Sequence, residues 1–303
     1  MKKIGITGSK GFVGQHLYHT LSLDTEKYQL VNYEKIFFEV EEELDAFVLQ
    51  CDVIVHLAAM NRHSDPAVIY KTNIELVKKL VASLKRTDSN AHVIMSSSSQ
   101  EEKDNLYGKS KKEGRDLLIN WGKESNGIFT GLIIPNVFGP FGKPNYNSVV
   151  ATFCHKIVIG ETPEVHIDGN LNLIYVGELI EEILQVINNE FGDKKLAIQA
   201  TTKVKVSEIL DLLNSYKTKY QDNGEIPQIN SVFQLNLFNT FRCYMDIKNH
   251  FPVKFKEHID SRGSFVEIIR LGVGGQMSFS TTVPGVTRGN HFHTRKIERF
   301  AVI

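Results

Sequence analysis

The sequence predicts an α/β protein with a doubly wound parallel sheet, followed by a shorter all-β segment. Through the first two hundred residues, short apolar runs alternate with longer amphipathic stretches, which is the pattern of parallel strands joined by crossover helices. Beyond residue 252 the pattern changes to short strand-like runs separated by turns that contain glycine or proline. These two observations place a domain boundary near residue 247. We therefore expect domains over residues 1–246 and 247–303.

Five parallel strands are predicted from the apolar runs of the first domain. Parallel strands covered by helices on both faces lack the alternation of half-exposed strands, and the runs at 53–57 and 132–134 have this continuous character. The expected strands are residues 3–7, 29–33, 52–57, 92–96 and 130–134.

Amphipathic stretches between these runs predict the helices, at residues 12–22, 66–86 and 106–123. A further helix is expected at 149–159, where Gly160 is placed to end it as a C-terminal cap. In the helix at 106–123, four residues are expected to share one apolar face: Leu106, Leu117, Leu118 and Trp121.

Composition and charge exclude several classes of protein. The 35 lysines and arginines balance the 35 aspartates and glutamates, so we expect neither a nucleic-acid groove nor binding to an anionic membrane. The longest apolar run, at 52–59, is too short to span a bilayer. The N-terminus runs directly into a strand, without room for a signal peptide. The three cysteines are far apart and are expected to be reduced. A cytoplasmic protein is therefore expected.

The chain opens with a strand, a glycine-rich turn and a helix, which together predict a dinucleotide-binding site of the Rossmann type. Gly8 permits the tight turn, Gly11 lets the backbone approach a pyrophosphate, and Gly14 lets the helix pack close to the strand. Phe12 and Val13 begin the helix, whose N–H groups and dipole favour phosphate binding. A glycine trio alone is weak, but its place at the first strand–helix junction makes the prediction specific.

The residues after the second strand bear on the choice of cofactor. An acidic residue about twenty positions past the glycines normally binds the adenosine 2′-hydroxyl of NAD. This sequence has Asn32 there, while Lys10 and Lys35 could bind a 2′-phosphate. Glu34 lies nearby and leaves NAD open as the alternative. We therefore expect NADPH.

Tyr107 and Lys111 are four residues apart, so on a helix they share one face. A free phenol titrates near pH 10, and a neighbouring ammonium favours the phenolate. Bringing the pKa of Tyr107 toward neutrality requires about 4 kcal/mol of differential stabilisation. We expect Lys111 to lower the pKa in this way, so that Tyr107 can exchange a proton at a carbonyl or hydroxyl group.

From residue 1 to about 180 the chain resembles the extended short-chain dehydrogenase/reductase family. The resemblance rests on the spacing of the three glycines, on the apolar run at 52–59, and on the Tyr-x-x-x-Lys pair at Tyr107 and Lys111. It implies that both of these residues also contact the cofactor. It implies four further contacts with the cofactor: Leu57, Ala58, Ala59 and Asn73.

The same resemblance implies residues that contact the substrate. Ser98 matches the serine that hydrogen-bonds the reacting oxygen, with Ser97 as the second candidate. Asn136 opens an Asn-Val-Phe-Gly-Pro stretch similar to that of nucleotide-sugar enzymes, in which this asparagine faces the substrate phosphates. It could instead cap the next segment, as asparagines often do.

Two departures from the family leave the substrate site open. The segment between Ser98 and Tyr107 is much shorter than in most extended members, so the shape of the sugar pocket is not predicted. The usual phosphate-binding arginine is absent, and Leu171 and Asn172 occupy its place. We expect another cation to substitute for it, and two candidates are Lys143 and Arg242.

The C-terminal segment resembles the opening half of RmlC-like cupins. Alternate residues of a strand point to one side, so His291 and His293 could face a common ion, with Glu298 as a third ligand. This ligand set predicts zinc or another divalent metal, although a polar strand edge is the alternative. The second cupin motif is missing before Ile303, so we expect an incomplete cupin and a fragment of a longer chain.

A reductase domain followed by a cupin resembles the bifunctional enzymes of capsular polysaccharide synthesis. This resemblance implies that a UDP-linked 2-acetamido-2,6-dideoxy-4-ketohexose is epimerised at C3 by the cupin. The reductase domain then reduces its C4 ketone with NADPH, giving UDP-2-acetamido-2,6-dideoxy-L-talose. We also expect a homodimer or higher homo-oligomer.

Three alternative functions stay open at this point. UDP-sugar 4-epimerases and 4,6-dehydratases retain NAD, for which an acidic residue at Asn32 is expected. Dehydratases also carry an Asp-Glu pair beside the serine, which Ser98-Ser99-Gln100 lacks. The third alternative is a redox sensor that binds NADP without catalysis. Such sensors commonly lose the tyrosine or the lysine, and this chain has both.

Overall fold

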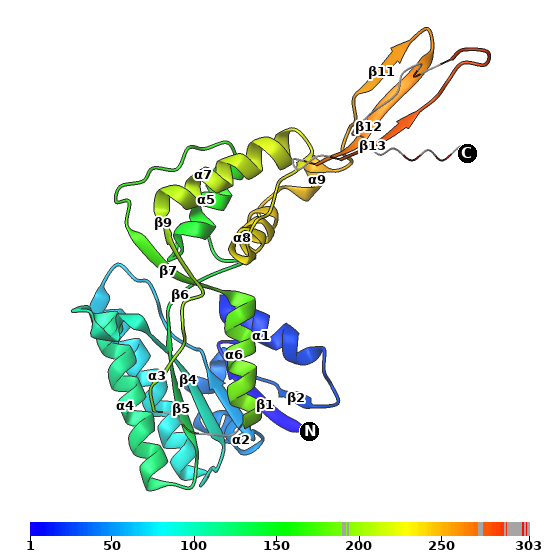
Figure 1. Cartoon of the computed structure of the whole chain (residues 1–303). Helices are drawn as coiled ribbons and strands as arrows, with labels where there is room; N and C mark the ends of the chain where they lie inside the picture. Colours follow the sequence, from blue (N-terminus) through cyan, green and yellow to red (C-terminus); the bar gives the residue numbers. More distant parts are fainter. Residues whose placement is uncertain are drawn as a thin grey trace. The chain divides into compact units, whose positions relative to one another are not determined.

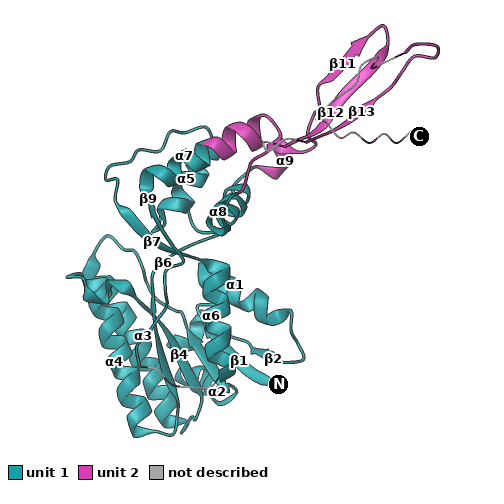
Figure 2. Ribbon diagram, in the orientation of Figure 1, with its two compact units in different colours: residues 1–214, 230–245 teal, residues 215–229, 246–303 magenta. Residues whose placement is uncertain are grey.

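The computed structural model describes residues 1–189, 192, 194–271, 275–287, 289, 299 and 301. The chain divides into two compact units (Figure 2). The first comprises Met1–Asn214 and Asn230–Met245, and the second comprises Ser215–Ile229 and Asp246–Ile303. The division into folding domains at residue 247 stays a prediction.

A six-stranded parallel sheet forms the centre of the first unit, in the order β2-β1-β3-β4-β5-β8. Its strands are β1 (Lys2–Thr7), β2 (Tyr28–Val31), β3 (Val53–His56), β4 (His92–Ser98), β5 (Phe129–Ile134) and β8 (Leu196–Ala197). The order of the first five, 2-1-3-4-5, is one of the two common doubly wound orders. In such sheets ligands bind at the carboxyl ends of the strands where the order reverses, here between β1 and β3.

Helices cover both faces of this sheet, as Figure 1 shows. One face carries α1 (Phe12–Ser22) and α6 (Val176–Asn189), and the other carries α2 (Glu41–Leu49), α3 (Pro66–Arg86) and α4 (Leu106–Glu124). Neighbouring strand residues enter opposite apolar clusters: Val53 and Val55 join the first, and Ile54 joins the second. This double burial explains the continuous apolar runs in the sequence and confirms the predicted fold class.

The predicted elements agree with the observed ones, with small differences. The helices at 12–22 and 66–86 have the predicted bounds, and the strand at 92–96 extends to Ser98. Leu118 and Trp121 of α4 are buried as expected, but Leu106 is 37% exposed. The prediction for Leu106 was wrong: this residue is the first of α4, directly after the N-cap Asn105, and lies at the exposed end of the helix.

A smaller three-stranded sheet, in the order β6-β7-β9, belongs to the same unit. Its strands are β6 (Asn136–Phe138), β7 (Asn170–Tyr175) and β9 (Thr202–Lys205), accompanied by α5 (Val149–Val158), α7 (Val206–Tyr216) and α8 (Val232–Arg242). Gly160 follows α5 with a φ of +84°, the left-handed conformation expected of a C-terminal cap.

The second unit contains a four-stranded sheet and the short helix α9 (Ile247–His250). The strands are β10 (Glu225–Ile226), β11 (Glu257–Asp260), β12 (Gly263–Leu271) and β13 (Gln276–Ser280). Strand β12 pairs in antiparallel fashion with β11 and β13, as the run of short strands and turns in the sequence predicts. Across the described residues of the whole chain, every helix is too short or too polar to cross a membrane.

Candidate active site

In the turn between β1 and α1, a side chain larger than that of glycine would collide with the backbone at two positions. Gly8 has a φ of +77°, and a Cβ atom added there would lie 2.8 Å from the backbone nitrogen of Ala58. A Cβ atom on Gly14 would lie 2.3 Å from the Gly8 carbonyl oxygen. Gly11 is the N-cap of α1 and has no side chain to occupy the N–H groups of the first helical turn, which begins at Phe12. This cradle fits the pyrophosphate of a dinucleotide.

Beside this turn, the ends of β1 and β3 are joined by hydrogen bonds. The Thr7 Oγ1 and His56 Nδ1 atoms lie 2.8 Å apart, and Leu57 N donates to the Thr7 carbonyl at 3.1 Å. Burial, assisted by the charge of Lys111, lowers the pKa of His56 to about 3, so this imidazole is neutral. Leu57, Ala58 and Ala59, expected to contact the cofactor, follow at the rim of this junction and are partly exposed.

Asn73 is buried on α3 and binds the loop that follows β3. Its Oδ1 accepts from Met60 N at 2.7 Å, and its Nδ2 donates to Met60 O and to Ser110 Oγ, each at 3.1 Å. Ser110 Oγ in turn donates to the Tyr107 carbonyl at 2.7 Å. Asn73 therefore connects the cofactor-side loop to the first turns of α4, and its direct contact with a cofactor stays a prediction.

The residues expected to select the cofactor lie at the surface around the end of β2. Asn32 follows the strand directly, Lys35 begins a 3-10 helix at Lys35–Glu39, and Lys10 lies in the glycine turn; all three are exposed. Within the described residues, neither lysine takes part in an ion pair. Glu34 is also exposed. The structure thus places two cations and one carboxylate near this corner.

Tyr107 and Lys111 lie together on the first two turns of α4. The Lys111 Nζ atom lies 5.9 Å from the centroid of the Tyr107 ring and donates to the Ser96 carbonyl at 3.0 Å. Burial lowers the pKa of Lys111 to about 8, opposed by the nearby carboxylate of Glu101. Burial raises the pKa of Tyr107 to about 12, with Tyr146 adding to the shift.

This result is opposite to the expected lowering of the Tyr107 pKa. Desolvation of the phenolate is the largest cause of this raised pKa, and the sequence could not reveal the burial. Tyr107 therefore keeps its proton at neutral pH. A protonated phenol beside a buried cation is suited to donating a proton.

Neighbouring serines at the end of β4 point to opposite sides, as strand residues do. Ser97 Oγ donates a hydrogen bond to Glu101 Oε1, so its proton is committed to that carboxylate. Ser98 Oγ accepts from Gln100 N at 3.1 Å, which leaves its own O–H as a donor. The geometry therefore favours Ser98 over Ser97 as the group that binds a reacting oxygen, and this role stays a prediction.

A buried ion pair that the sequence analysis missed lies beside these serines. Arg115 Nε lies 2.9 Å from Glu101 Oε1, and Arg115 Nη2 donates to Glu101 Oε2 at 3.0 Å. Glu101 lies in the short 3-10 helix Ser99–Glu102, and Arg115 lies on α4. A Cβ atom on Gly108 would lie 1.9 Å from the Gln100 carbonyl oxygen, so this turn and α4 fit closely together. The Tyr107-Gly108 dipeptide was the local signal that could have revealed this approach.

On the side of the smaller sheet, Asn136 is exposed at the start of β6, opposite Leu173 of β7. The two cations expected to replace the family arginine lie over aromatic rings. Lys143 Nζ lies 5.3 Å from the centroid of Tyr146, and the Arg242 guanidinium lies 5.6 Å from that of Phe238.

A pocket of about 740 Å³ lies between the loop that follows β3 and the region around α5. Its lining contains two cations missed by the sequence analysis, Arg62 and Lys156. Tyr146 lines the same pocket, and Arg62 Nη1 donates to its carbonyl at 2.5 Å and to that of Asn145 at 2.7 Å. No local sequence signal predicts this contact, because Arg62 lies 83 and 84 residues before the two carbonyls.

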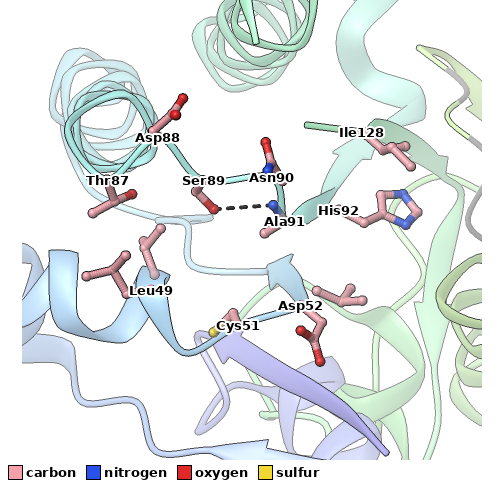
Figure 3. A pocket seen from close by; sticks show the side chains of 12 residues that line it. Leu49, Cys51, Asp52, Thr87, Asp88, Ser89, Asn90, Ala91, His92 and Ile128 are labelled. Atoms are coloured by element: carbon pink, nitrogen blue, oxygen red, sulfur yellow. Dashed lines mark hydrogen bonds between the residues drawn. The ribbon is translucent and has the colours of Figure 1, made fainter. Parts of the chain in front are cut away.

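Figure 3 shows a different pocket, of about 410 Å³, at the amino ends of β3 and β4. Cys51, Asp52 and Ser89 line it, and its described lining contains none of the predicted site residues. Burial raises the pKa of the Cys51 thiol to about 12, so this thiol is unreactive at neutral pH. The candidate active site therefore lies at the opposite, carboxyl edge of the sheet.

The predicted metal ligands His291, His293 and Glu298 lie outside the described residues. Among the residues that are described, no three histidine, cysteine, aspartate or glutamate side chains come together to bind a metal ion. The metal site stays a prediction.

Comparison with known proteins relates the chain to enzymes of nucleotide sugars. Residues 4–200 match the NAD dependent epimerase/dehydratase family, and residues 258–303 match the polysaccharide biosynthesis C-terminal domain. The UDP-2-acetamido-2,6-beta-L-arabino-hexul-4-ose reductase of Pseudomonas aeruginosa is 29% identical over 306 residues, which cover 99% of this chain and 80% of the relative.

Solved structures agree with this relationship. The capsular polysaccharide assembling protein CapF from Staphylococcus aureus has a TM-score of 0.81 and 32% identity, covering 96% of this chain and 78% of that chain. RMD from Pseudomonas aeruginosa, solved with NADPH, has a TM-score of 0.67 and covers 80% of this chain and 98% of its own. Its 18% identity shows the fold alone. The resemblance to a protein of capsular polysaccharide synthesis, inferred from the sequence, is confirmed.

Proposed function

Because this chain belongs to the NAD dependent epimerase/dehydratase family, we propose that it reduces the C4 ketone of a UDP-linked 2-acetamido-2,6-dideoxy-4-ketohexose with NADPH. An NAD(P)-dependent enzyme of the nucleotide-sugar reductase and epimerase type is the broader class to which it belongs. The observation that carries the proposal is the pairing of Tyr107 with Lys111 on α4, where the Lys111 Nζ atom lies 5.9 Å from the centroid of the tyrosine ring. A reductase needs a proton donor at this position.

The cofactor-binding residues follow from the geometry of the turn. Gly8, Gly11 and Gly14 would hold the pyrophosphate, while Lys10 and Lys35 would bind the 2′-phosphate that distinguishes NADPH. Bound NADPH supplies the hydride that the ketone carbon accepts.

The protein's own groups complete the reduction. Tyr107 donates its proton to the C4 oxygen, and Ser98 donates a hydrogen bond to the same oxygen. The ammonium of Lys111 stabilises the phenolate left on Tyr107. One hydride and one proton convert the ketone into an alcohol.

The same residues weigh against the alternative functions. Epimerases and dehydratases retain NAD, for which an acidic residue is expected at the position that Asn32 occupies. Glu101 could be mistaken for the acid of a dehydratase, but Arg115 and Ser97 occupy its carboxylate. A sensor without catalysis would not require Tyr107 and Lys111 together.

The C-terminal residues extend the proposal. We propose that His291, His293 and Glu298 bind a divalent metal, with zinc as the best fit to the donors, in a cupin that epimerises C3. The combined product would be UDP-2-acetamido-2,6-dideoxy-L-talose. Homo-oligomer formation is part of the same proposal.

The test is NADPH consumption with a panel of UDP-linked and dTDP-linked 4-ketosugars. We expect oxidation of NADPH with the UDP-linked amino sugar and a 4-hydroxy product by NMR. Interconversion of sugars without net consumption of NADPH, with NAD retained by the purified protein, would identify an epimerase or dehydratase instead.

A further inference from the structure

The proposed substrate carries a diphosphate, which needs cations that the family position no longer supplies. That position, ahead of Tyr175, holds Leu171 and Asn172 on β7. A diphosphate buried without positive partners would be strongly disfavoured, since each anionic oxygen loses its hydration. Positive charge must therefore come from another part of the site.

The lining of the 740 Å³ pocket contains two such groups, from different segments of the chain. Arg62 lies in the loop after β3, and Lys156 lies in the last turn of α5. Within the described residues neither forms an ion pair with a carboxylate. Glu164 also lines the pocket, so Arg62, Lys156 and Glu164 together carry a net charge of +1. The volume lies in the range of pockets that bind small molecules.

Two backbone carbonyls of the segment before α5 hold the Arg62 side chain in position. Its Nη1 donates to the carbonyls of Asn145 and Tyr146, and Asn145 N donates to Thr152 Oγ1 at 3.0 Å. A guanidinium has five N–H donors, so one anchored nitrogen leaves donors on the others. An anchored guanidinium loses little further conformational entropy on binding phosphate, and its planar shape suits two phosphate oxygens.

We propose that Arg62 and Lys156 bind the diphosphate of the nucleotide-sugar substrate, in place of the missing family arginine. This inference rests on the proposed function. It replaces Lys143 and Arg242 as the expected cations, because neither lines the pocket. Tyr146 also lines this pocket and lies close enough to Tyr107 to contribute to the raised pKa of that residue, so a diphosphate held here would be tethered near the catalytic tyrosine.

The experiment measures binding of UDP and of uridine by titration calorimetry to the whole chain with NADPH present. Arg62→Gln and Lys156→Gln should each weaken UDP binding about tenfold or more, because each loses a charge-assisted contact. Uridine, which has no phosphate, should bind all variants alike. Lys143→Gln and Arg242→Gln are the matched controls and should bind UDP as the wild type does.

The outcomes separate this inference from the proposed function. UDP binding that survives both substitutions, or that is lost in the control variants instead, would overturn the roles of Arg62 and Lys156 and leave the function intact. If the wild-type chain bound NADPH but neither UDP nor uridine, that result would contradict the proposed nucleotide-sugar function itself. If Arg62→Gln fails to fold, Lys156→Gln and the charge-preserving Arg62→Lys decide the question, and Arg62→Lys should weaken UDP binding less than Lys156→Gln does.

Discussion

Lys111 directs its amine toward Tyr107, with the Nζ atom 5.9 Å from the ring centroid, while a hydrogen bond to the Ser96 carbonyl fixes it from the other side. Lys111 is buried and Tyr107 is partly exposed, and desolvation favours the neutral form of each. The carboxylate of Glu101, on the short segment after β4, raises the pKa of Lys111 against this burial, and the neutral imidazole of His56 lies near Lys111 from β3. The amine of Lys111 therefore titrates within the pH range of an activity assay, and the phenol of Tyr107 does not.

Reduction should slow as the pH rises through about 8. Lys111, whose pKa is lowered to about 8, is an ammonium below this pH and a neutral amine above it. The ammonium stabilises the phenolate that forms on Tyr107, so its loss raises the barrier, while Tyr107 keeps its proton until about pH 12. The pH profile of kcat/KM for NADPH-dependent reduction measures the effect.

Lys111→Arg is the matched control for this profile, because an arginine keeps its charge throughout the range. Its rate should be lower, since a guanidinium fits the site less well, but the decline near pH 8 should disappear. A rate that increases with pH through 8 would show that the neutral amine is the active form and that the assigned role of Lys111 is wrong.

Tyr107→Phe should abolish reduction and leave NADPH affinity within about twofold, because the substitution removes the proton donor and keeps the ring. Stopped-flow measurement of NADPH oxidation, with cofactor binding followed by fluorescence, tests both statements. A variant that retains more than a tenth of the wild-type rate would exclude Tyr107 as the acid.

Local sequence signals predicted the parts of the site that depend on neighbouring residues. Gly14 closely approaches the carbonyl oxygen of Gly8, a few residues earlier, and Gly8 approaches the backbone of Ala58 after the adjacent strand. The glycine turn could be predicted because these contacts are local. Helix α2 was missed although Leu44, Phe47 and Val48 have helical spacing and are buried, so its signal was present in the sequence.

Contacts formed by the tertiary fold could not be predicted in this way. Arg115 and Glu101 are 14 residues apart, and Arg62 meets the carbonyl of Tyr146 across 84 residues. The pKa of Tyr107 was predicted in the wrong direction because the spacing reveals the neighbouring lysine but not the depth of burial. Charge and spacing thus identify candidate groups, while their protonation depends on packing.

NADPH should bind more tightly than NADH, because Lys10 and Lys35 flank the end of β2 where Asn32 replaces an acidic residue. The double variant Lys10→Ala with Lys35→Ala should reduce the difference in affinity between the two cofactors, because it weakens the binding of NADPH and leaves that of NADH unchanged. Titration calorimetry with both cofactors measures it, and exposed Lys71→Ala on α3 serves as the control. Equal affinities in the unsubstituted protein would contradict the 2′-phosphate site.

Arg115→Met should destabilise the protein by about 3–5 kcal/mol, because it leaves the Glu101 carboxylate buried without its partner. The double variant Glu101→Leu with Arg115→Met removes both charges and should recover much of that loss. Its reduction rate should nevertheless stay below that of the wild type. The pair joins α4 to the turn at Ser99–Glu102, and Glu101 also supports the charge of Lys111.

Urea unfolding and steady-state kinetics on the wild type, Arg115→Met and the double variant separate these effects. If the pair were purely structural, the double variant would recover rate and stability together, with an unchanged pH profile. If Glu101 also supports the ammonium of Lys111, the double variant should lose rate at a lower pH than the wild type, since removing a nearby carboxylate lowers the pKa of a buried lysine further. A double variant with wild-type kcat and a wild-type pH profile would limit the role of Glu101 and Arg115 to stability.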